Sequence, residues 1–105
     1  MNADTFERPP ETRNEIRVLQ FFCYIVECTD GTYYTGWSTD PERRARQHNA
    51  GRGARYTRTR LPVRLVYVEE CPDRASAMRR EIKIKQMGRG AKEKLIKQRL
   101  LTGAV

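Results

Sequence analysis

The fold is constrained most by residues 18–37, because their pattern specifies a β-hairpin with a tight turn. The hairpin begins with "VLQFFCYIVEC", which is rich in the aromatic and β-branched residues that favour a strand. A turn follows with the sequence "TDGT", and the partner strand then reads "YYTGW". We therefore expect the folded part of the chain to begin with two antiparallel strands.

The length of the turn decides which faces the tyrosines of the hairpin occupy, because side chains alternate along each strand. A two-residue turn would place Tyr24 and Tyr34 on opposite faces. A three-residue turn uses Gly31 in the left-handed conformation, and it pairs Val26 with Tyr34 and Tyr24 with Gly36. In that register the two phenols share a face, and Gly36 leaves a gap through which a ligand could approach the backbone. Ordinary strand packing is the alternative role for either tyrosine.

A helix is predicted after the hairpin, followed by a basic loop. The helical segment is "STDPERRARQHNAG", with Thr39 or Asp40 as its cap, Pro41 in its first turn and Gly51 at its end. The next segment, "GRGARYTRTRLP", contains so much glycine and arginine that we expect a loop there.

One more strand and two helices are predicted in the second half of the chain. The strand is "VRLVYVEE", in which alternate residues should face opposite sides of the sheet. The two sets are Val63, Leu65, Tyr67 and Glu69 on one face, and Arg64, Val66, Val68 and Glu70 on the other. Asp73 then caps a helix, "RASAMRREIKIKQM", that ends at Gly88, and "AKEKLIKQRLL" forms a last basic amphipathic helix.

The order strand, strand, helix, strand, helix, helix predicts an α/β fold. We expect a small three-stranded, mainly antiparallel sheet flanked by helices. The 105 residues suit a single domain, which we place at residues 18–101. Residues 1–17 are polar and contain "RPPE", so we interpret them as a flexible tail, and residues 102–105 as a short C-terminal tail.

The charge of the chain favours a phosphate-rich partner. Lysine and arginine number 21 against 13 aspartate and glutamate residues, which gives a net charge of +8. Such an excess creates a positive potential that attracts DNA or RNA, although it is also found in cationic proteins without such a partner. No apolar run approaches the roughly 20 residues that span a bilayer, so we expect no membrane association and a place in the cytoplasm, or at the nucleoid within it.

The three cysteines do not form a recognisable metal-binding or disulfide pattern. Cys23, Cys28 and Cys71 are an odd number, include no CxxC pair, and have no second histidine with which to complete a zinc site. We expect reduced thiols that pack inside the domain.

Arg44 and the only histidine of the chain, His48, are candidates for phosphodiester chemistry. They are four residues apart and therefore project from one side of the predicted helix. A guanidinium matches the geometry of a phosphate, and an imidazole can accept or pass on a proton near neutral pH. A solvated basic face is the alternative interpretation of the same residues.

Glu81 lies in the middle of an apolar pattern on the predicted helix that follows Asp73. Ala75, Met78 and Ile82 lie on one side of it, and Ala77 and Ile84 on the other. A carboxylate in such a position needs a cation, a hydrogen-bond donor or a metal ion. Lys85, one turn later, could be that cation. The other interpretation is a ligand for one hard metal ion such as Mg²⁺, completed by water and phosphate oxygens. No second acidic residue is placed to hold a partner ion.

The order and spacing of these tyrosines, Arg44, His48 and Glu81 resemble the GIY-YIG nuclease superfamily. The resemblance is closest to its small stand-alone bacterial members of the excision-nuclease and intron-endonuclease type. The resemblance covers about residues 20 to 96 and includes the stretch "NAGRGARYTRTRLPVRLVYVEE". The residues that match its motifs are Tyr24 in "FCY", Tyr34 and Gly36 in "YTG", Arg44 and His48 as Arg-x-x-x-His, and Glu81 in "MRREIKIK". The chain lacks the first glycine of the family and has Thr35 where isoleucine is usual, but neither position should supply a reacting group.

The resemblance implies a metal-dependent endonuclease that hydrolyses DNA with low sequence specificity, in DNA repair or processing. It implies one Mg²⁺ or Mn²⁺ ion held by Glu81. Tyr24, helped by His48 or a water, would take a proton from the attacking water, and a nearby cation would have to favour its phenolate. Arg44 would neutralise charge on the phosphate, and Tyr34 would position the water or the phosphate.

The arginines of the basic loop are expected to follow the nucleic-acid backbone, with Tyr56 stacking or reaching the scissile site. These arginines are Arg52, Arg55, Arg58 and Arg60. Backbone contacts carry no sequence information, so double-stranded, branched or single-stranded DNA could be the substrate. Two alternatives remain: a nucleic-acid-binding protein that kept the fold without cleavage, and an accessory protein that docks through its last helix.

Overall fold

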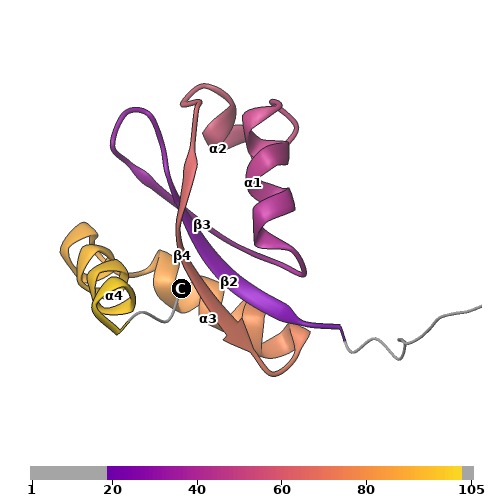
Figure 1. The fold of residues 1–105 in the computed structure, drawn as a ribbon, viewed down its shortest axis with the longest axis vertical. Helices are drawn as coiled ribbons and strands as arrows, with labels where there is room; N and C mark the ends of the chain where they lie inside the picture. Colours follow the sequence, from indigo (N-terminus) through magenta and orange to yellow (C-terminus); the bar gives the residue numbers. More distant parts are fainter. Residues whose placement is uncertain (1–18, 103–105) are drawn as a thin grey trace, which may run out of the picture.

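The computed structural model describes residues 19–102 as a three-stranded sheet with helices on both faces. The strands are β2 (Phe21–Glu27), β3 (Tyr33–Ser38) and β4 (Arg64–Cys71), and the helices are α1 (Pro41–Asn49), α2 (Arg55–Arg58), α3 (Arg74–Lys85) and α4 (Arg89–Thr102). The sheet is antiparallel in the order β3-β2-β4. Helices α1 and α2 lie on one face, and α3 and α4 on the other (Figure 1). The predicted fold class is confirmed.

The predicted tails fall mostly outside the described residues. Residues 1–17 lie outside them, and so do residues 103–105. Helix α4 runs to Thr102, which is one residue beyond the predicted end of the domain. Within the described range, none of the helices is long and apolar enough to cross a membrane.

The hairpin has the register that the three-residue turn predicts. Cys28 closes the turn with a bond from its N–H to the Thr32 carbonyl at 2.8 Å, and the Gly31 N–H donates back to Cys28 at 2.9 Å. Gly31 has φ of +84°, which is the left-handed conformation that this turn requires. Tyr24 is therefore paired with Gly36, and Val26 with Tyr34.

Helix α1 is confirmed, but the prediction of a plain loop after it is wrong. The Asp40 side chain caps α1 by accepting the Arg43 N–H at 3.1 Å, and Pro41 is in the first turn. The basic segment then contains the one-turn helix α2, which has no side-chain cap. Its stability comes from tertiary contacts, because Thr57 is fully buried against α1, and local sequence patterns do not report such contacts.

Strand β4 does not keep the simple alternation that its sequence predicts. Opposite β2, Tyr67 pairs with Ile25 while Leu65 pairs with Val26, so Val66 is an extra residue in a β-bulge. Because of this extra residue, the β4 side chains before the bulge point to the opposite face of the sheet from the one that the alternation predicts. Leu65 packs with Tyr24 and Val26 on the α1 face, whereas Tyr67 packs on the α3 face. The prediction that Leu65 and Tyr67 share a face is therefore wrong.

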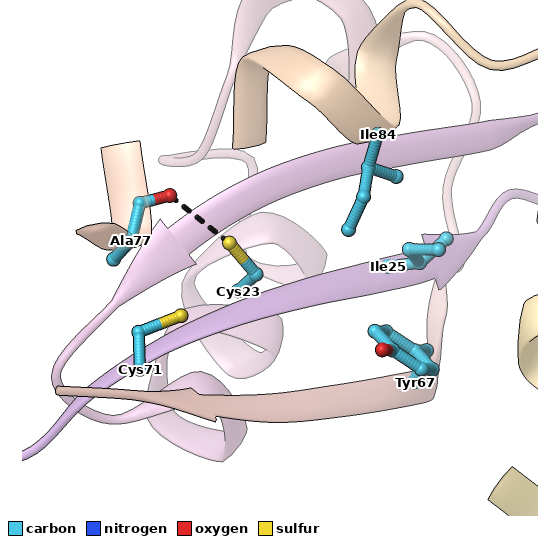
Figure 2. Close-up of a cluster of buried hydrophobic side chains, with 6 residues drawn as sticks. All are labelled: Cys23, Ile25, Tyr67, Cys71, Ala77 and Ile84. Carbon is cyan, nitrogen blue, oxygen red and sulfur yellow. Dashed lines mark hydrogen bonds between the residues drawn. The ribbon is translucent and has the colours of Figure 1, made fainter. Parts of the chain in front are cut away.

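The core on the α3 face contains two of the three cysteines. Figure 2 shows Cys23 and Cys71 side by side beneath Ala77 and Ile84, with the Cys23 thiol bonded to the Ala77 carbonyl at 3.0 Å. Burial, together with the neighbouring Cys71, raises the pKa of the Cys23 thiol. All three cysteines are buried and free, which confirms the prediction of packed thiols.

Helix α3 buries only one of the two apolar sides that its sequence suggests. Ala77 and Ile84 are fully buried, whereas Met78 is 44% exposed and Ile82 is 55% exposed. The helix lies on one face of the sheet, and no other described element covers its outer side (Figure 1). Glu81 is therefore at the edge of the buried stripe and not in its middle.

Candidate active site

Tyr24 and Gly36 form the floor of the candidate site on the α1 face of the sheet. Tyr24 is 1% exposed. A side-chain Cβ at Gly36 would lie 2.6 Å from the Tyr24 hydroxyl and 2.7 Å from its ring. The expected gap at Gly36 for a ligand is thus filled by the tyrosine ring itself. Only glycine allows the phenol to lie this close to the backbone of the neighbouring strand.

His48 contacts the Tyr24 phenol from helix α1. The Tyr24 hydroxyl lies 2.9 Å from His48 Nε2 in a fully buried hydrogen bond. The two residues come from β2 and α1, so the hairpin register and the packing of α1 on the sheet together bring them into contact. This hydrogen bond joins the side chains of two of the predicted catalytic residues.

The other side of the imidazole is enclosed by the segment that contains α2. His48 Nδ1 lies 2.8 Å from the hydroxyl of Thr57, and this hydroxyl also lies 2.9 Å from the Ala54 carbonyl. A Cβ at Gly53 would lie 2.2 Å from Nδ1, so only glycine fits there. The sequence does not single out Gly53 and Thr57, since both lie in the basic segment after α1 and no local pattern marks them.

The environment keeps Tyr24 protonated and His48 neutral at pH 7. Burial raises the pKa of Tyr24 to about 12, although hydrogen bonding and charge from Arg44 act in the opposite direction. Arg44 is thus the nearby cation that favours the phenolate, but desolvation has the larger effect and the pKa of Tyr24 remains raised. Burial, reinforced by the Arg44 charge, lowers the pKa of His48 below 6.5. A phenol that holds its proton thus faces an uncharged imidazole.

The lowered pKa of His48 predicts that the domain loses stability as the pH falls below 6.5. Above that value His48 is neutral in both the folded and the unfolded chain. Below it the unfolded chain binds a proton that the buried imidazole resists, so acid favours unfolding down to the lowered pKa. Asp30 and Asp73 have pKa values lowered from 3.8, so their contributions are lost at lower pH than this window.

Urea denaturation followed by Trp37 fluorescence measures this effect. We expect the free energy of unfolding to fall between about pH 6.5 and pH 5 in the full chain, and to fall less in His48→Gln. A wild-type free energy that stays constant over this range would contradict the burial of a neutral imidazole.

Tyr34 lies between His48 on α1 and Lys85, the partner of Glu81, on α3. Its ring lies edge-on to the imidazole at 5.3 Å between centroids and is stacked with Tyr56 at 6.1 Å. The ammonium of Lys85 lies 5.6 Å from the Tyr34 ring centroid. Residues of α1, α2 and α3 therefore meet around this phenol of β3.

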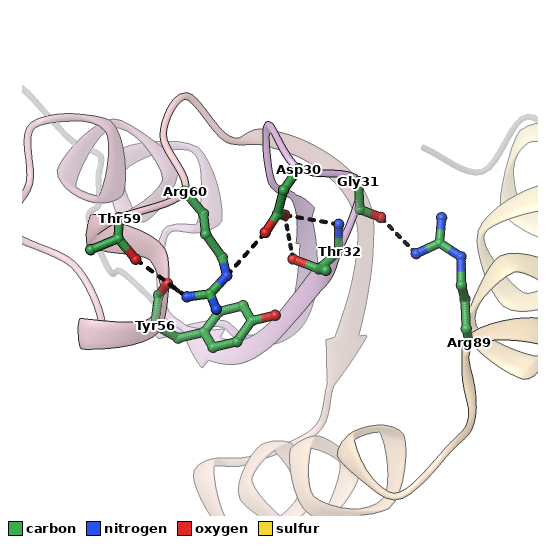
Figure 3. Close-up of polar contacts among 7 residues, drawn as sticks. All are labelled: Asp30, Gly31, Thr32, Tyr56, Thr59, Arg60 and Arg89. Atoms are coloured by element: carbon green, nitrogen blue, oxygen red, sulfur yellow. Dashed lines mark hydrogen bonds and ion pairs between the residues drawn. The ribbon is translucent and has the colours of Figure 1, made fainter.

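Arg60 holds Tyr56 and the hairpin turn in place. Its guanidinium lies 3.9 Å from the centroid of the Tyr56 ring and donates to the Asp30 carboxylate at 3.1 Å (Figure 3). It also donates to the Tyr56 carbonyl at 2.7 Å. These contacts support the turn and the position of Tyr56. Arg52, Arg55 and Arg58 are exposed, and none of them makes an ion pair with another residue in 19–102.

Arg44 is half-buried beside the tyrosine and histidine pair. Its guanidinium donates to the Gln47 side chain at 3.0 Å, which fixes it along α1. Its charge acts on the pKa of both Tyr24 and His48, so the cation lies close to both groups. A phosphate bound at Tyr24 would therefore lie within reach of Arg44.

Glu81 reaches the same region from α3, and it pairs with Lys85. The Lys85 Nζ to Glu81 Oε2 distance is 3.5 Å, and the Glu81 side chain is 18% exposed. The negative charge of Glu81 is the smallest of the causes that shift the pKa of Tyr24, and its partner Lys85 lies 5.6 Å from the Tyr34 ring centroid. The predicted lysine partner is thus present, but the pair is long and involves one carboxylate oxygen.

The donor set at Glu81 suits a metal ion that is held partly by substrate. No cluster of three or more His, Cys, Asp or Glu side chains within residues 19–102 could hold an ion by itself. A single carboxylate that pairs with Lys85 through one oxygen, in a chain of net charge +8, offers a hard oxygen ligand of the kind that Mg²⁺ and Mn²⁺ prefer. These residues fit an ion that also takes ligands from water and phosphate.

A separate hollow of about 980 Å³ lies between α1 and α4 at the outer edge of β4. It is lined by apolar residues such as Phe22, Val68 and Leu100, and it contains none of the predicted site residues. Its lining lacks a buried acid–base pair like that of Tyr24 and His48. The hollow is therefore separate from the candidate site, although charged residues such as Glu42 and Arg46 also line it.

The comparisons with known proteins agree with this geometry. A family model described as the GIY-YIG catalytic domain matches residues 20–97. A UPF0213 protein of Halobacterium salinarum is 56% identical over 72 residues, which are 69% of this chain and 94% of the relative. A UPF0213 protein of Streptococcus agalactiae is 52% identical over 77 residues, which are 73% of this chain and 88% of the relative.

A solved structure supports the same assignment. The solution NMR structure of a protein from E. faecalis has a TM-score of 0.53 and 37% sequence identity, and the match covers 78% of this chain and 88% of that one. Residues 20–97, which match the family model, include the tyrosine hairpin, the helix with Arg44 and His48, and Glu81. The chain therefore belongs to the GIY-YIG family of endonuclease domains.

Proposed function

We propose that the protein is a metal-dependent endonuclease that hydrolyses DNA phosphodiester bonds with little sequence preference. The observation that carries this proposal is the buried hydrogen bond of 2.9 Å between the Tyr24 hydroxyl and His48 Nε2. An acid–base pair of this kind costs free energy to bury, and it lies where Arg44 and Glu81 also converge. Packing of the core does not by itself require a tyrosine, a histidine, an arginine and a glutamate in the same region.

The proton of the attacking water passes through Tyr24. A phenol whose pKa is raised to about 12 does not lose its proton to solvent at pH 7. It can take the proton of a water if it gives its own to the neutral His48 in the same step. Tyr24 is then a proton relay, and His48 is the base that finally holds the proton.

The remaining residues act on the phosphate. Arg44 places a fixed positive charge beside the phosphate, where negative charge develops during attack. Tyr34 orients the water or the phosphate through its hydroxyl. Glu81 would hold a single Mg²⁺ or Mn²⁺ ion, which would supply Lewis-acid stabilisation of the negative charge that develops on the phosphate and on the leaving 3′ oxygen.

The exposed arginines suit the binding of a nucleic-acid backbone. Arg52, Arg55 and Arg58 lie on the α2 side of the site, and the chain has a net charge of +8. Contacts of this type attract phosphates without reading bases. We therefore propose DNA as the substrate, with a role in DNA repair or processing in the cytoplasm or at the nucleoid.

Cleavage assays with the full chain test this proposal. We expect the purified protein to nick supercoiled plasmid or cut a labelled fork in Mg²⁺ or Mn²⁺, and to be inactive in EDTA. Equal cleavage in EDTA would contradict the metal requirement. Binding without cleavage in both metals, across double-stranded, branched and single-stranded DNA, would instead indicate a nucleic-acid-binding protein that kept the fold.

A further inference from the structure

The direction of the proton path through His48 depends on which ring nitrogen carries its proton. A neutral imidazole has one N–H, and the two tautomers give opposite directions to the bond with Tyr24. If Nε2 carries the proton, it donates to the phenol and cannot accept from it. If Nδ1 carries the proton, Nε2 is free to accept the proton of Tyr24. The contacts of the other ring nitrogen decide between these states.

The hydroxyl of Thr57 has a single proton and two neighbours that could receive it. Its Oγ1 lies 2.9 Å from the Ala54 carbonyl, which can only accept, and 2.8 Å from His48 Nδ1. A threonine hydroxyl in the first turn of a helix commonly donates to the carbonyl three residues earlier, as here. The hydroxyl then offers its lone pair to Nδ1, which must be the donor.

The competing tautomer uses a poorer set of contacts. It requires Nδ1 to accept, with the Ala54 N–H at 3.4 Å as one donor, and it requires Thr57 to turn its proton away from the Ala54 carbonyl. A separation of 3.4 Å is beyond the usual 2.7–3.2 Å range of N–H hydrogen bonds. The first arrangement keeps two short bonds at the fully buried His48 and Thr57 side chains, whereas the second replaces one of them with the long, partly buried contact to Ala54.

We propose that Thr57 is a positioning residue that fixes His48 as the Nδ1–H tautomer and so leaves Nε2 free to receive the proton of Tyr24. The enclosure by Gly53 and Ala54 keeps water from Nδ1 and prevents the ring from turning. The orienting group is a neutral hydroxyl and not a carboxylate, so the imidazole stays uncharged until catalysis. The tautomer follows from the contacts alone, whereas its catalytic consequence rests on the proposed nuclease function.

Hydrolysis of the phosphodiester in this arrangement uses one water and one proton acceptor, His48. The water gives a proton to Tyr24 Oη as Tyr24 passes its own proton to His48 Nε2, and the water oxygen forms the new bond to phosphorus. The P–O3′ bond breaks with its electron pair on the 3′ oxygen, which takes a proton from solvent. The imidazolium keeps its Nδ1–H bond to Thr57 and later returns one proton to solvent.

Nitrogen NMR of the full chain tests the tautomer without reference to cleavage. His48 is the only histidine, so a long-range ¹H–¹⁵N correlation spectrum of uniformly labelled protein has one imidazole to assign. We expect a protonated Nδ1 and an unprotonated Nε2 at pH 7.5 in the wild type and in Thr57→Ser. In Thr57→Val the Nε2–H tautomer should gain population. A wild-type spectrum with Nε2 protonated would overturn the proposal.

Single-turnover cleavage tests the consequence. We expect Thr57→Val to lower the rate constant by about 10² to 10³-fold with unchanged DNA affinity, since a wrongly oriented base loses most of its acid–base contribution. Thr57→Ser should stay within a few-fold of the wild type, and so should Thr59→Val, which removes an exposed hydroxyl in the same segment.

Melting temperatures and amide spectra of each variant identify any loss of fold. A folded Thr57→Val variant with the wild-type rate would overturn the proposal. A wild type that cuts no DNA would overturn the nuclease function, while the NMR result would still decide the tautomer.

Discussion

Replacing Glu81 with glutamine is expected to abolish most DNA cleavage while leaving DNA binding nearly intact. Glutamine keeps the size of the side chain but removes the charge that would hold a divalent ion. Metal stabilisation of a phosphoryl group is worth several kcal/mol, and each 1.36 kcal/mol is tenfold in rate, so we expect a loss of at least about 100-fold. Affinity should change little, because most of it would come from phosphate contacts to arginines and lysines.

The control for Glu81→Gln is Glu93→Gln on α4. Glu93 also pairs with a cation one turn away in its helix, with Arg89 at 3.0 Å. Among the contacts of residues 19–102, neither member of this pair touches Tyr24, Tyr34 or His48. The control should cleave at the wild-type rate. Cleavage by Glu81→Gln at the wild-type rate, with the same dependence on Mg²⁺, would contradict a metal-binding role and leave Glu81 as a structural partner of Lys85.

Replacing Gly53 with alanine is expected to remove activity by displacing His48. The new methyl group would lie 2.2 Å from Nδ1 and 2.8 Å from the His48 Cα, so both the ring and the backbone of α1 would have to move. Overpacking of this kind typically costs about 1–3 kcal/mol, which most domains survive. We expect a folded protein of lower stability whose Tyr24 to His48 bond is broken, with cleavage reduced at least about 100-fold.

The control for Gly53→Ala is Gly90→Ala in the first turn of α4. No atom lies within 4 Å of a Cβ there, and alanine is the better helix former by up to about 1 kcal/mol. Urea denaturation and cleavage of both variants should be measured together. A Gly53→Ala variant that is as stable and as active as Gly90→Ala would show that the enclosure of His48 is unimportant.

Local sequence rules predicted the hairpin correctly, because its register is set by the turn. The left-handed Gly31 and the Tyr24 to Gly36 pairing depend only on residues close in sequence. The cap of α1 at Asp40 is equally local. The positions of Tyr24, Tyr34, Arg44 and His48 in one region follow from these elements once α1 packs on the sheet.

Features that depend on distant contacts could not be predicted. The bulge at Val66 arises from pairing with β2, about forty residues earlier, and no turn residue marks it. The exposed side of α3 depends on what the rest of the chain covers. Helix α2 and Thr57 are stable because they pack against His48. The sequence therefore identifies His48 as a candidate, but it does not predict which groups orient its ring.

The close contact between Tyr24 and Gly36 also links correct folding to activity. A shift of β3 by one residue would place Thr35 or Trp37 opposite Tyr24, and either side chain would occupy the space of the phenol ring. Molecules with a misaligned hairpin could then be compact and could still bind DNA through their arginines, but they would not align a phenol with the histidine. Cleavage activity per molecule would thus measure the fraction of chains whose strands have paired in the native register.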